Sequence, residues 1–174
     1  SFGNLLPSEL ILLSSIFTLV FPIASFGFEP ADDSVMKNPP HIVGQKLFNL
    51  KNVLVSMGIG AGIALVPFIV SLFNFDMPYA PTSMFVSLVL TLILYLYSSR
   101  SNEFFFKRLL KNRFMFISSI VCLAITIILV ATPINSVFGI ESMTNDGWIS
   151  SLILPFIVPT IFETIKLVRL FLKK

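Results

Sequence analysis

Residues 53–73 read VLVSMGIGAGIALVPFIVSLF, an apolar run that contains no charged side chain. A helix of about 20 such residues crosses the roughly 30 Å hydrocarbon core of a bilayer. Runs of similar length and composition recur at residues 10–28, 82–99, 114–132 and 148–170, and short polar clusters separate them. The repetition of this length predicts five membrane spans rather than the core of a soluble domain.

The overall composition agrees with a chain that lipid solvates. Of the 174 residues, 55% are hydrophobic and only 12% are charged, and the mean hydropathy is +0.91. These values leave too few polar groups to coat a water-soluble domain. We therefore expect an all-α integral membrane protein, with residues 1–174 forming a single bundle of five transmembrane helices. The one cysteine, Cys122, lies in an apolar run and excludes a disulfide framework.

Basic residues occur in only some of the connections. Residues 29–52 and 100–113 and the carboxy-terminal end contain lysine or arginine, whereas residues 74–81 and 133–147 contain neither. Five spans place all 12 Lys and Arg residues on one face, which is the cytoplasmic face by the positive-inside rule. This pattern predicts an external amino terminus, a cytoplasmic carboxy terminus and cytoplasmic loops at 29–52 and 100–113. Because the basic residues lie in loops beside membrane spans, membrane topology accounts for the net charge of +3. No nucleic-acid partner is therefore expected.

The first predicted span carries the run SSIFTLVFPIASFG at residues 14–27. Ser15, Thr18 and Pro22 are three to four residues apart and share one helix face. A proline in mid-span frees a backbone carbonyl, and irregular backbone at this depth lies against protein or a water-filled cavity. Two hydroxyls and this carbonyl form a candidate cation pathway. Ordinary helix packing through small residues is the alternative.

Two further patterns have simpler interpretations. Gly58 and Gly62 form a GxxxG step, which predicts close packing of the second span against another helix. Glu163 and Lys166 are one helical turn apart near the predicted cytoplasmic end of the last span, so we expect an ion pair rather than a transport site. The sequence contains no HExxH and no GxxxxGK[ST], the metalloprotease and nucleotide-binding motifs considered.

Four segments, in order along the chain, resemble one known family. They are GFEPADDSVMKNPPH at residues 27–41, APTSMFVSLVL at 80–90, YSSRSNEFFFKRLLKNR at 97–113 and FETIKLVRLF at 162–171. Together they resemble the carboxy-terminal membrane region, helices six to ten, of a bacterial-type cation-transporting P-type ATPase. The resemblance implies that the segment after the first span couples the membrane helices to the phosphorylation domain. Its candidate coupling residues are Asp32, Asp33, Pro39 and Pro40.

The chain departs from the calcium and sodium pumps at the expected cation ligands. In those relatives the sixth helix carries an aspartate before its proline, and here the corresponding position is Leu19. The eighth helix has an aliphatic residue, about Leu92, where the calcium pumps have an acid. Because carboxylates offset the dehydration of a divalent ion, their loss leaves the transported metal unknown. Ser15, Thr18 and the carbonyls near Pro22 remain the candidate contacts.

The resemblance implies a fragment of a larger pump, calcium-pump-like or related. ATP and Mg²⁺ are expected for the intact pump, whereas this chain lacks the DKTGT phosphorylation motif and is expected to hold no cofactor. Its implied partners are the bilayer of the cell membrane, an inorganic cation, and an amino-terminal half with the catalytic domains and first five helices. Alternatively, the chain is a free-standing membrane scaffold without chemistry. An in-frame DKTGT motif upstream of Ser1 would distinguish the pump from the scaffold.

Overall fold

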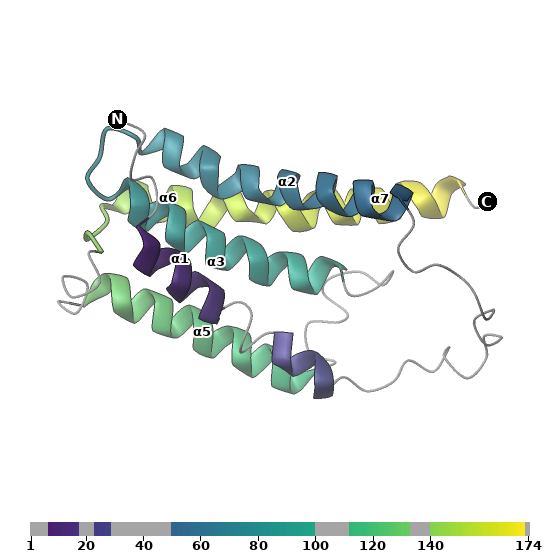
Figure 1. The fold of residues 1–174 in the computed structure, drawn as a ribbon, viewed down its shortest axis with the longest axis horizontal. Helices are drawn as coiled ribbons and strands as arrows, with labels where there is room; N and C mark the ends of the chain where they lie inside the picture. Colours follow the sequence, from purple (N-terminus) through teal and green to yellow (C-terminus); the bar gives the residue numbers. More distant parts are fainter. Residues whose placement is uncertain (1–6, 18–22, 29–49, 100–111, 133–139, 173–174) are drawn as a thin grey trace.

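A computed structural model describes residues 7–17, 23–28, 50–99, 112–132 and 140–172. These ranges form helices without any strand, which confirms the predicted all-α class for the described part of the chain (Figure 1). The helices are α1 (Ser8–Ser15), α2 (Leu50–Phe73), α3 (Ala80–Ser99), α5 (Arg113–Ala131), α6 (Asn145–Ile153) and α7 (Ile157–Leu172), with short 3₁₀ turns η3 (Ser25–Phe28) and η6 (Leu154–Phe156).

Four stretches are long and apolar enough to cross a membrane: Val53–Phe73, Ala80–Ser99, Arg113–Ala131 and Asn145–Val168. They coincide with the second to fifth predicted spans, so the chain is a multi-pass membrane protein. The first predicted span, residues 10–28, includes most of α1 and all of η3, while residues 18–22 between them lie outside the described ranges. The five-helix count and the side on which each terminus lies therefore stay predictions.

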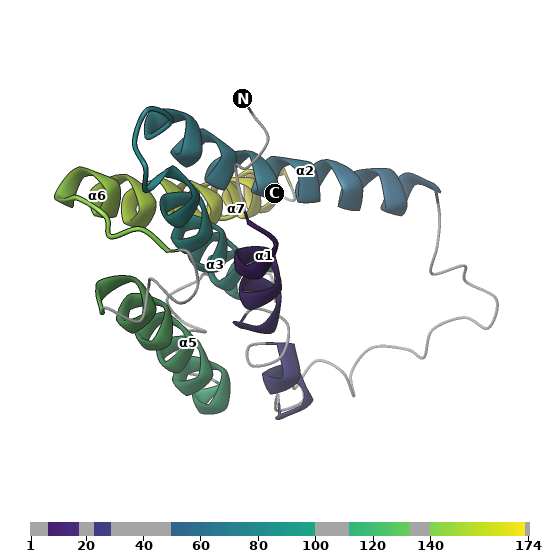
Figure 2. The ribbon, with the colours of Figure 1, turned by 60° about the vertical axis from the view of Figure 1, so that its left-hand side comes forward.

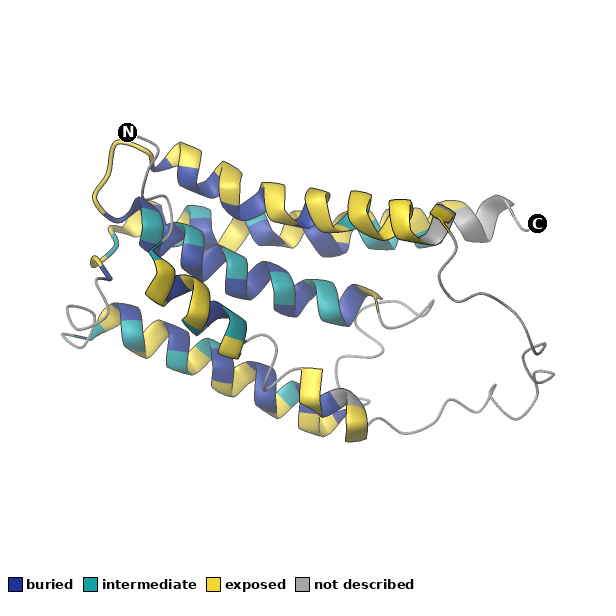
Figure 3. Cartoon of the chain, in the orientation of Figure 1, coloured by how far each residue is buried: buried dark blue, intermediate teal, exposed yellow. Residues whose placement is uncertain are grey.

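Helix α3 is the centre of the bundle. Of its span, 67% is buried inside the protein, compared with 17% for the span of α2. Its core stripe runs through Phe85, Val89, Ile93 and Tyr97, which recur every four residues along one face. Helices α2, α6 and α7 pack on one side of α3, and α1 and α5 lie on the other (Figures 1 and 2). The outer face of α2 is exposed along most of its length (Figure 3).

The last span is interrupted at Pro155. Helix α6 gives way to the 3₁₀ turn η6, and α7 continues the chain to Leu172. Proline lacks a backbone N–H and its ring clashes with the preceding turn, which explains a local change in helix geometry here. By contrast, Pro67 lies inside α2 and the helix continues through it.

Hydrogen bonds join α6 to the hairpin formed by α2 and α3. Asn74 Nδ2 donates to Ser150 Oγ at 3.1 Å, and Ser151 Oγ donates to the Ser83 carbonyl at 3.2 Å. Both links tie the start of the last span to the connection end of the hairpin. Polar contacts between membrane helices satisfy groups that lipid cannot.

Candidate functional site

Helix α1 contributes the described part of the candidate cation pathway. It begins after Pro7, whose carbonyl accepts hydrogen bonds from the amides of Leu10 and Ile11 at 3.0 and 3.2 Å. Pro7 is the N-cap residue of α1, and an N-cap carbonyl is the first acceptor of a helix. Leu10, Ser14 and Phe17 are buried, as expected for residues one and two turns apart on one face.

The predicted site residue Ser15 lies beside this buried face. Its side chain is half-buried, and its hydroxyl donates to the Ile11 carbonyl at 2.9 Å. The buried Ser14 hydroxyl donates to the same carbonyl at 2.8 Å. A hydroxyl that donates to its own helix keeps an oxygen that accepts, so Ser15 can still contact a cation. The structure thus places one predicted hydroxyl at the edge of the buried face of α1.

The other predicted pathway residues, Thr18 and Pro22, lie outside the described ranges. The residues on either side of them are both hydrogen-bonded to α5. Cys122 Sγ donates to the Phe17 carbonyl at 3.2 Å, and Asn112 Nδ2 donates to the Ser25 carbonyl at 3.2 Å. Helix α5 therefore holds the chain directly before and shortly after the segment that carries Thr18 and Pro22.

The Asn112 side chain makes two hydrogen bonds at the start of α5. Its side-chain oxygen accepts a hydrogen bond from the Met115 amide at 3.0 Å, which is an N-cap, while its amide nitrogen reaches the Ser25 carbonyl. The residue is only 3% exposed. Sequence reasoning missed this link and that of Cys122, because each joins positions about ninety or more residues apart. The only local signal was an asparagine just before an apolar run.

Carboxylates do not gather near this site in the part of the chain that the structure describes. No group of three or more His, Cys, Asp or Glu side chains there is arranged to hold a metal ion. The predicted coupling residues Asp32, Asp33, Pro39 and Pro40 lie outside the described residues. The acidic residue in the described part of α1 is Glu9, in its first turn, so a cation contact at Ser15 would use hydroxyl and carbonyl oxygens.

Two further predictions concern the second and last spans. The ion pair between Glu163 and Lys166 is confirmed, with Lys166 Nζ donating to Glu163 Oε1 at 2.9 Å. The predicted close packing at Gly58 and Gly62 is not made by any described helix, because a Cβ added to either would meet no atom within 4 Å, and it stays a prediction. Both glycines instead line a cavity. The motif permits a close approach, but no described helix makes one.

The fold and this hydroxyl-lined helix define the chain as a multi-pass membrane domain. A family model described as cation transporting ATPase, C-terminus, matches residues 5–168. The chain belongs to this family and represents the carboxy-terminal transmembrane region of a cation-transporting ATPase. A search of curated proteins found no match to the chain. The family assignment confirms the resemblance on which the sequence interpretation was based.

Proposed function

We propose that this chain is the membrane domain of an ATP-driven P-type cation pump of the cell membrane. In this proposal the first span contributes to the ion pathway, and α2, α3, α5, α6 and α7 support it. The supporting observation is the pair of hydrogen bonds from α5 to Phe17 and Ser25, on either side of residues 18–22. A pathway that binds a cation through neutral oxygens needs those oxygens at fixed positions. The two hydrogen bonds from α5 limit the movement of the segment that carries these oxygens.

The chemistry of the candidate ligands limits the kind of site. Ser15 and Thr18 offer hydroxyls, and the proline at position 22 frees a backbone carbonyl in the preceding turn. Neutral oxygens of this kind replace the hydration shell of an ion without neutralising its charge. We therefore propose a pump that is related to the calcium pumps but whose described pathway contributes no acidic ligand.

The upstream half of the pump would supply the chemical energy. ATP and Mg²⁺ would act in its catalytic domains, and the coupling residues Asp32, Asp33, Pro39 and Pro40 would pass the resulting movement to the first span. The buried side chains of α3 would resist that movement, because shifting a closely packed helix face would break its packing contacts. The hydrogen bonds from Cys122 to Phe17 and from Asn112 to η3 would then guide the segment that moves.

Replacing Thr18 tests this proposal in the intact pump. Thr18→Val keeps the shape of the side chain and removes the hydroxyl, and we expect about a tenfold weaker apparent cation affinity in ATPase assays. The matched control is Thr160→Val, because Thr160 is exposed on α7 and its hydroxyl donates only to the carbonyls of Phe156 and Ile157, one turn earlier in the same span. Membrane insertion, measured by protease protection, should be unchanged in both variants.

The two variants separate a pathway role from a packing role. If Thr18→Val and Thr160→Val show the same cation dependence as the unmodified pump, Thr18 does not contact the ion. If Thr18→Val lowers activity at saturating cation without changing its apparent affinity, the hydroxyl supports the helix and not the pathway. Ser15→Ala provides a second test on a described residue, and its effect should be in the same direction as that of Thr18→Val.

A further inference from the structure

A row of buried hydroxyl groups follows one side of the central helix α3. Its members, each at most 1% exposed and one or two turns from the next, are Ser83, Ser87, Thr91 and Ser98. The three serine hydroxyls donate to carbonyls of α3 itself, at 2.8, 3.0 and 2.9 Å. Thr91 differs from them, because its Oγ1 has no hydrogen-bond partner among the described residues. A buried hydroxyl in this state costs free energy unless a further molecule bonds to it.

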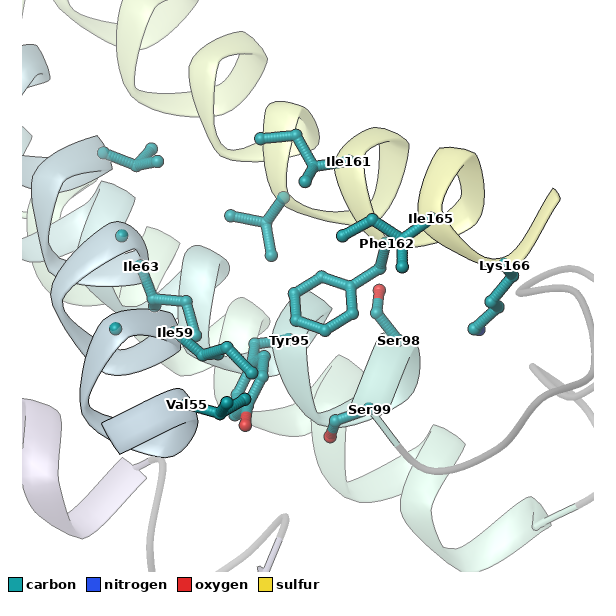
Figure 4. A pocket seen from close by; sticks show the side chains of 14 residues that line it. Val55, Ile59, Ile63, Tyr95, Ser98, Ser99, Ile161, Phe162, Ile165 and Lys166 are labelled. Atoms are coloured by element: carbon teal, nitrogen blue, oxygen red, sulfur yellow. The ribbon is translucent and has the colours of Figure 1, made fainter. Parts of the chain in front are cut away.

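The contacts on either side of Thr91 show which part of the last span it faces. One contact is the hydrogen bond from Ser151 Oγ to the Ser83 carbonyl. The other joins the rings of Tyr95 and Phe162, whose centroids are 5.6 Å apart (Figure 4). Thr91 lies between these two positions on α3, and α3 contacts both η6 and α7. It therefore faces the segment of the last span that runs from η6 into the first turn of α7.

Two prolines interrupt this segment of the last span. Pro155 and Pro159 are four residues apart, and both are buried. Proline has no backbone N–H, so the carbonyls of Ser151 and Pro155 lack the donor that an α-helix would supply four residues later. In a membrane, such carbonyls are satisfied by side chains of neighbouring helices or by ordered water. Pro159 and Thr91 are each eight residues past the bonded pair Ser151 and Ser83, which places the Pro155 carbonyl, directed toward Pro159, at the level of Thr91.

We propose that an internal water molecule bridges the Thr91 hydroxyl to the Pro155 carbonyl and so joins α3 to the last span inside the bundle. The water accepts a hydrogen bond from Thr91 Oγ1 and donates one to the Pro155 carbonyl. Its second hydrogen can bond to Ser87 Oγ, which donates to the Met84 carbonyl and still accepts. Three partners are the usual number for a buried water.

A cavity of about 750 Å³ between α2, α3 and α7 adjoins this position (Figure 4). Its lining includes Tyr95, one turn after Thr91, and Val158, which directly precedes Pro159. The cavity thus offers space through which a water molecule can reach Thr91. The proposed water itself lies inside the described bundle, since Thr91 is fully buried. Its presence therefore depends neither on what covers the outer side of α2 nor on the proposed cation pathway.

A crystal structure of the full 174-residue chain that resolves ordered water tests the bridge directly. We expect a water peak within hydrogen-bonding distance of both Thr91 Oγ1 and the Pro155 carbonyl oxygen. Thr91→Ser keeps the hydroxyl and should keep the peak, whereas Thr91→Val should lose it. An empty position in the unmodified chain, or a direct hydrogen bond from Thr91 Oγ1 to a carbonyl of α3, would overturn the proposal.

Stability distinguishes a bridged hydroxyl from one that has no partner. In denaturant titrations in mixed micelles, Thr91→Val should lower the equilibrium constant of folding about fivefold, because it leaves the Pro155 carbonyl without its water. The matched control is Thr126→Val, with a change below about twofold, because Thr126 is 1% exposed and donates to the Cys122 carbonyl of its own helix. A higher folding constant for Thr91→Val would contradict the bridge, since removing a buried hydroxyl that lacks a partner is favourable.

Pro159→Ala tests the second partner of the water. Alanine restores the amide that bonds the Pro155 carbonyl within the helix, so in this background Thr91→Val should change the folding constant by less than about twofold. Pro67→Ala is the control, because Pro67 is a buried proline inside α2, and the fivefold effect of Thr91→Val should persist there. If the effect persists in the Pro159→Ala background as well, the Pro155 carbonyl is not the partner and the proposal fails.

Discussion

Gly147 lies so close to Tyr79 that a Cβ added to the glycine would be 2.7 Å from Cε2 of the tyrosine ring. The ring has little room to move away, because Tyr79 is 5% exposed and its hydroxyl accepts a hydrogen bond from Thr144 Oγ1 at 2.7 Å. Tyr79 directly precedes α3, and Gly147 lies in the first turn of α6. The last span is therefore joined to the central helix where both begin.

Gly147→Ala should destabilise the bundle by about 1–3 kcal/mol, because the added methyl group overpacks the Tyr79 contact. The free energy of unfolding can be measured by denaturant titration in mixed micelles. Gly60→Ala is the control, since its Cβ would meet no atom within 4 Å and alanine favours a helix over glycine. Equal stability of the two variants would show that the Tyr79 ring moves aside freely.

The hydrogen bond between Asn74 and Ser150 should couple α2 to α6. Asn74 directly follows α2, and its Nδ2 donates to Ser150 Oγ and also to the Val70 carbonyl of α2 at 2.9 Å. A double-mutant cycle with Asn74→Ala and Ser150→Ala should give a coupling energy of about 0.6 kcal/mol, the typical value for such pairs between membrane helices. Additive effects of the two substitutions would mean that the pair contributes nothing beyond its separate contacts.

The two hydrogen bonds of Asn112 can be separated by substitution. Asn112→Ala removes the cap of α5 and the link to the Ser25 carbonyl, whereas Asn112→Ser keeps a capping oxygen and loses only the link. We expect the serine variant to be more stable than the alanine variant by about 1 kcal/mol. In the intact pump both variants should weaken cation affinity, since both release η3 from α5. Normal cation affinity in both variants would show that the hydrogen bond from Asn112 to Ser25 does not affect the cation pathway.

Labelling of introduced cysteines tests the predicted topology. Cys122 is fully buried, so we expect it to resist thiol reagents, and a Cys122→Ser background removes it altogether. Asp76→Cys lies in the connection between α2 and α3, and Arg113→Cys lies at the start of α5; both positions are exposed. An impermeant reagent added to intact cells should label position 76 and not position 113. The reverse pattern would invert the predicted orientation.

The membrane helices were predictable because length and apolar composition determine them locally. Residues 53–73 illustrate this, since α2 contains all of the predicted span. The contact between Gly147 and Tyr79 was not predictable, because it depends on how two distant segments pack. The GxxxG motif is limited for a related reason: it shows that Gly58 and Gly62 allow a close approach, but the spacing does not identify the partner helix.

The candidate pathway was predictable only in part. Hydroxyls near a mid-span proline pointed to the first span, and the structure places Ser15 beside the buried face of α1. The residues that hold this span, Cys122 and Asn112, belong to another helix and have no local pattern that relates them to it. Their role follows from the fold, because only three-dimensional packing brings α5 to Phe17 and Ser25.

ATP-driven cation uptake into sealed vesicles tests the proposed pump most directly. The intact pump, with its upstream catalytic half, is reconstituted with labelled calcium, sodium or potassium, and ATP is compared with a non-hydrolysable analogue. We expect one of these cations to accumulate only with ATP, and Thr18→Val to weaken its apparent affinity. If the reconstituted protein is correctly inserted but takes up none of these cations in an ATP-dependent manner, the result would contradict the proposal and favour a membrane scaffold.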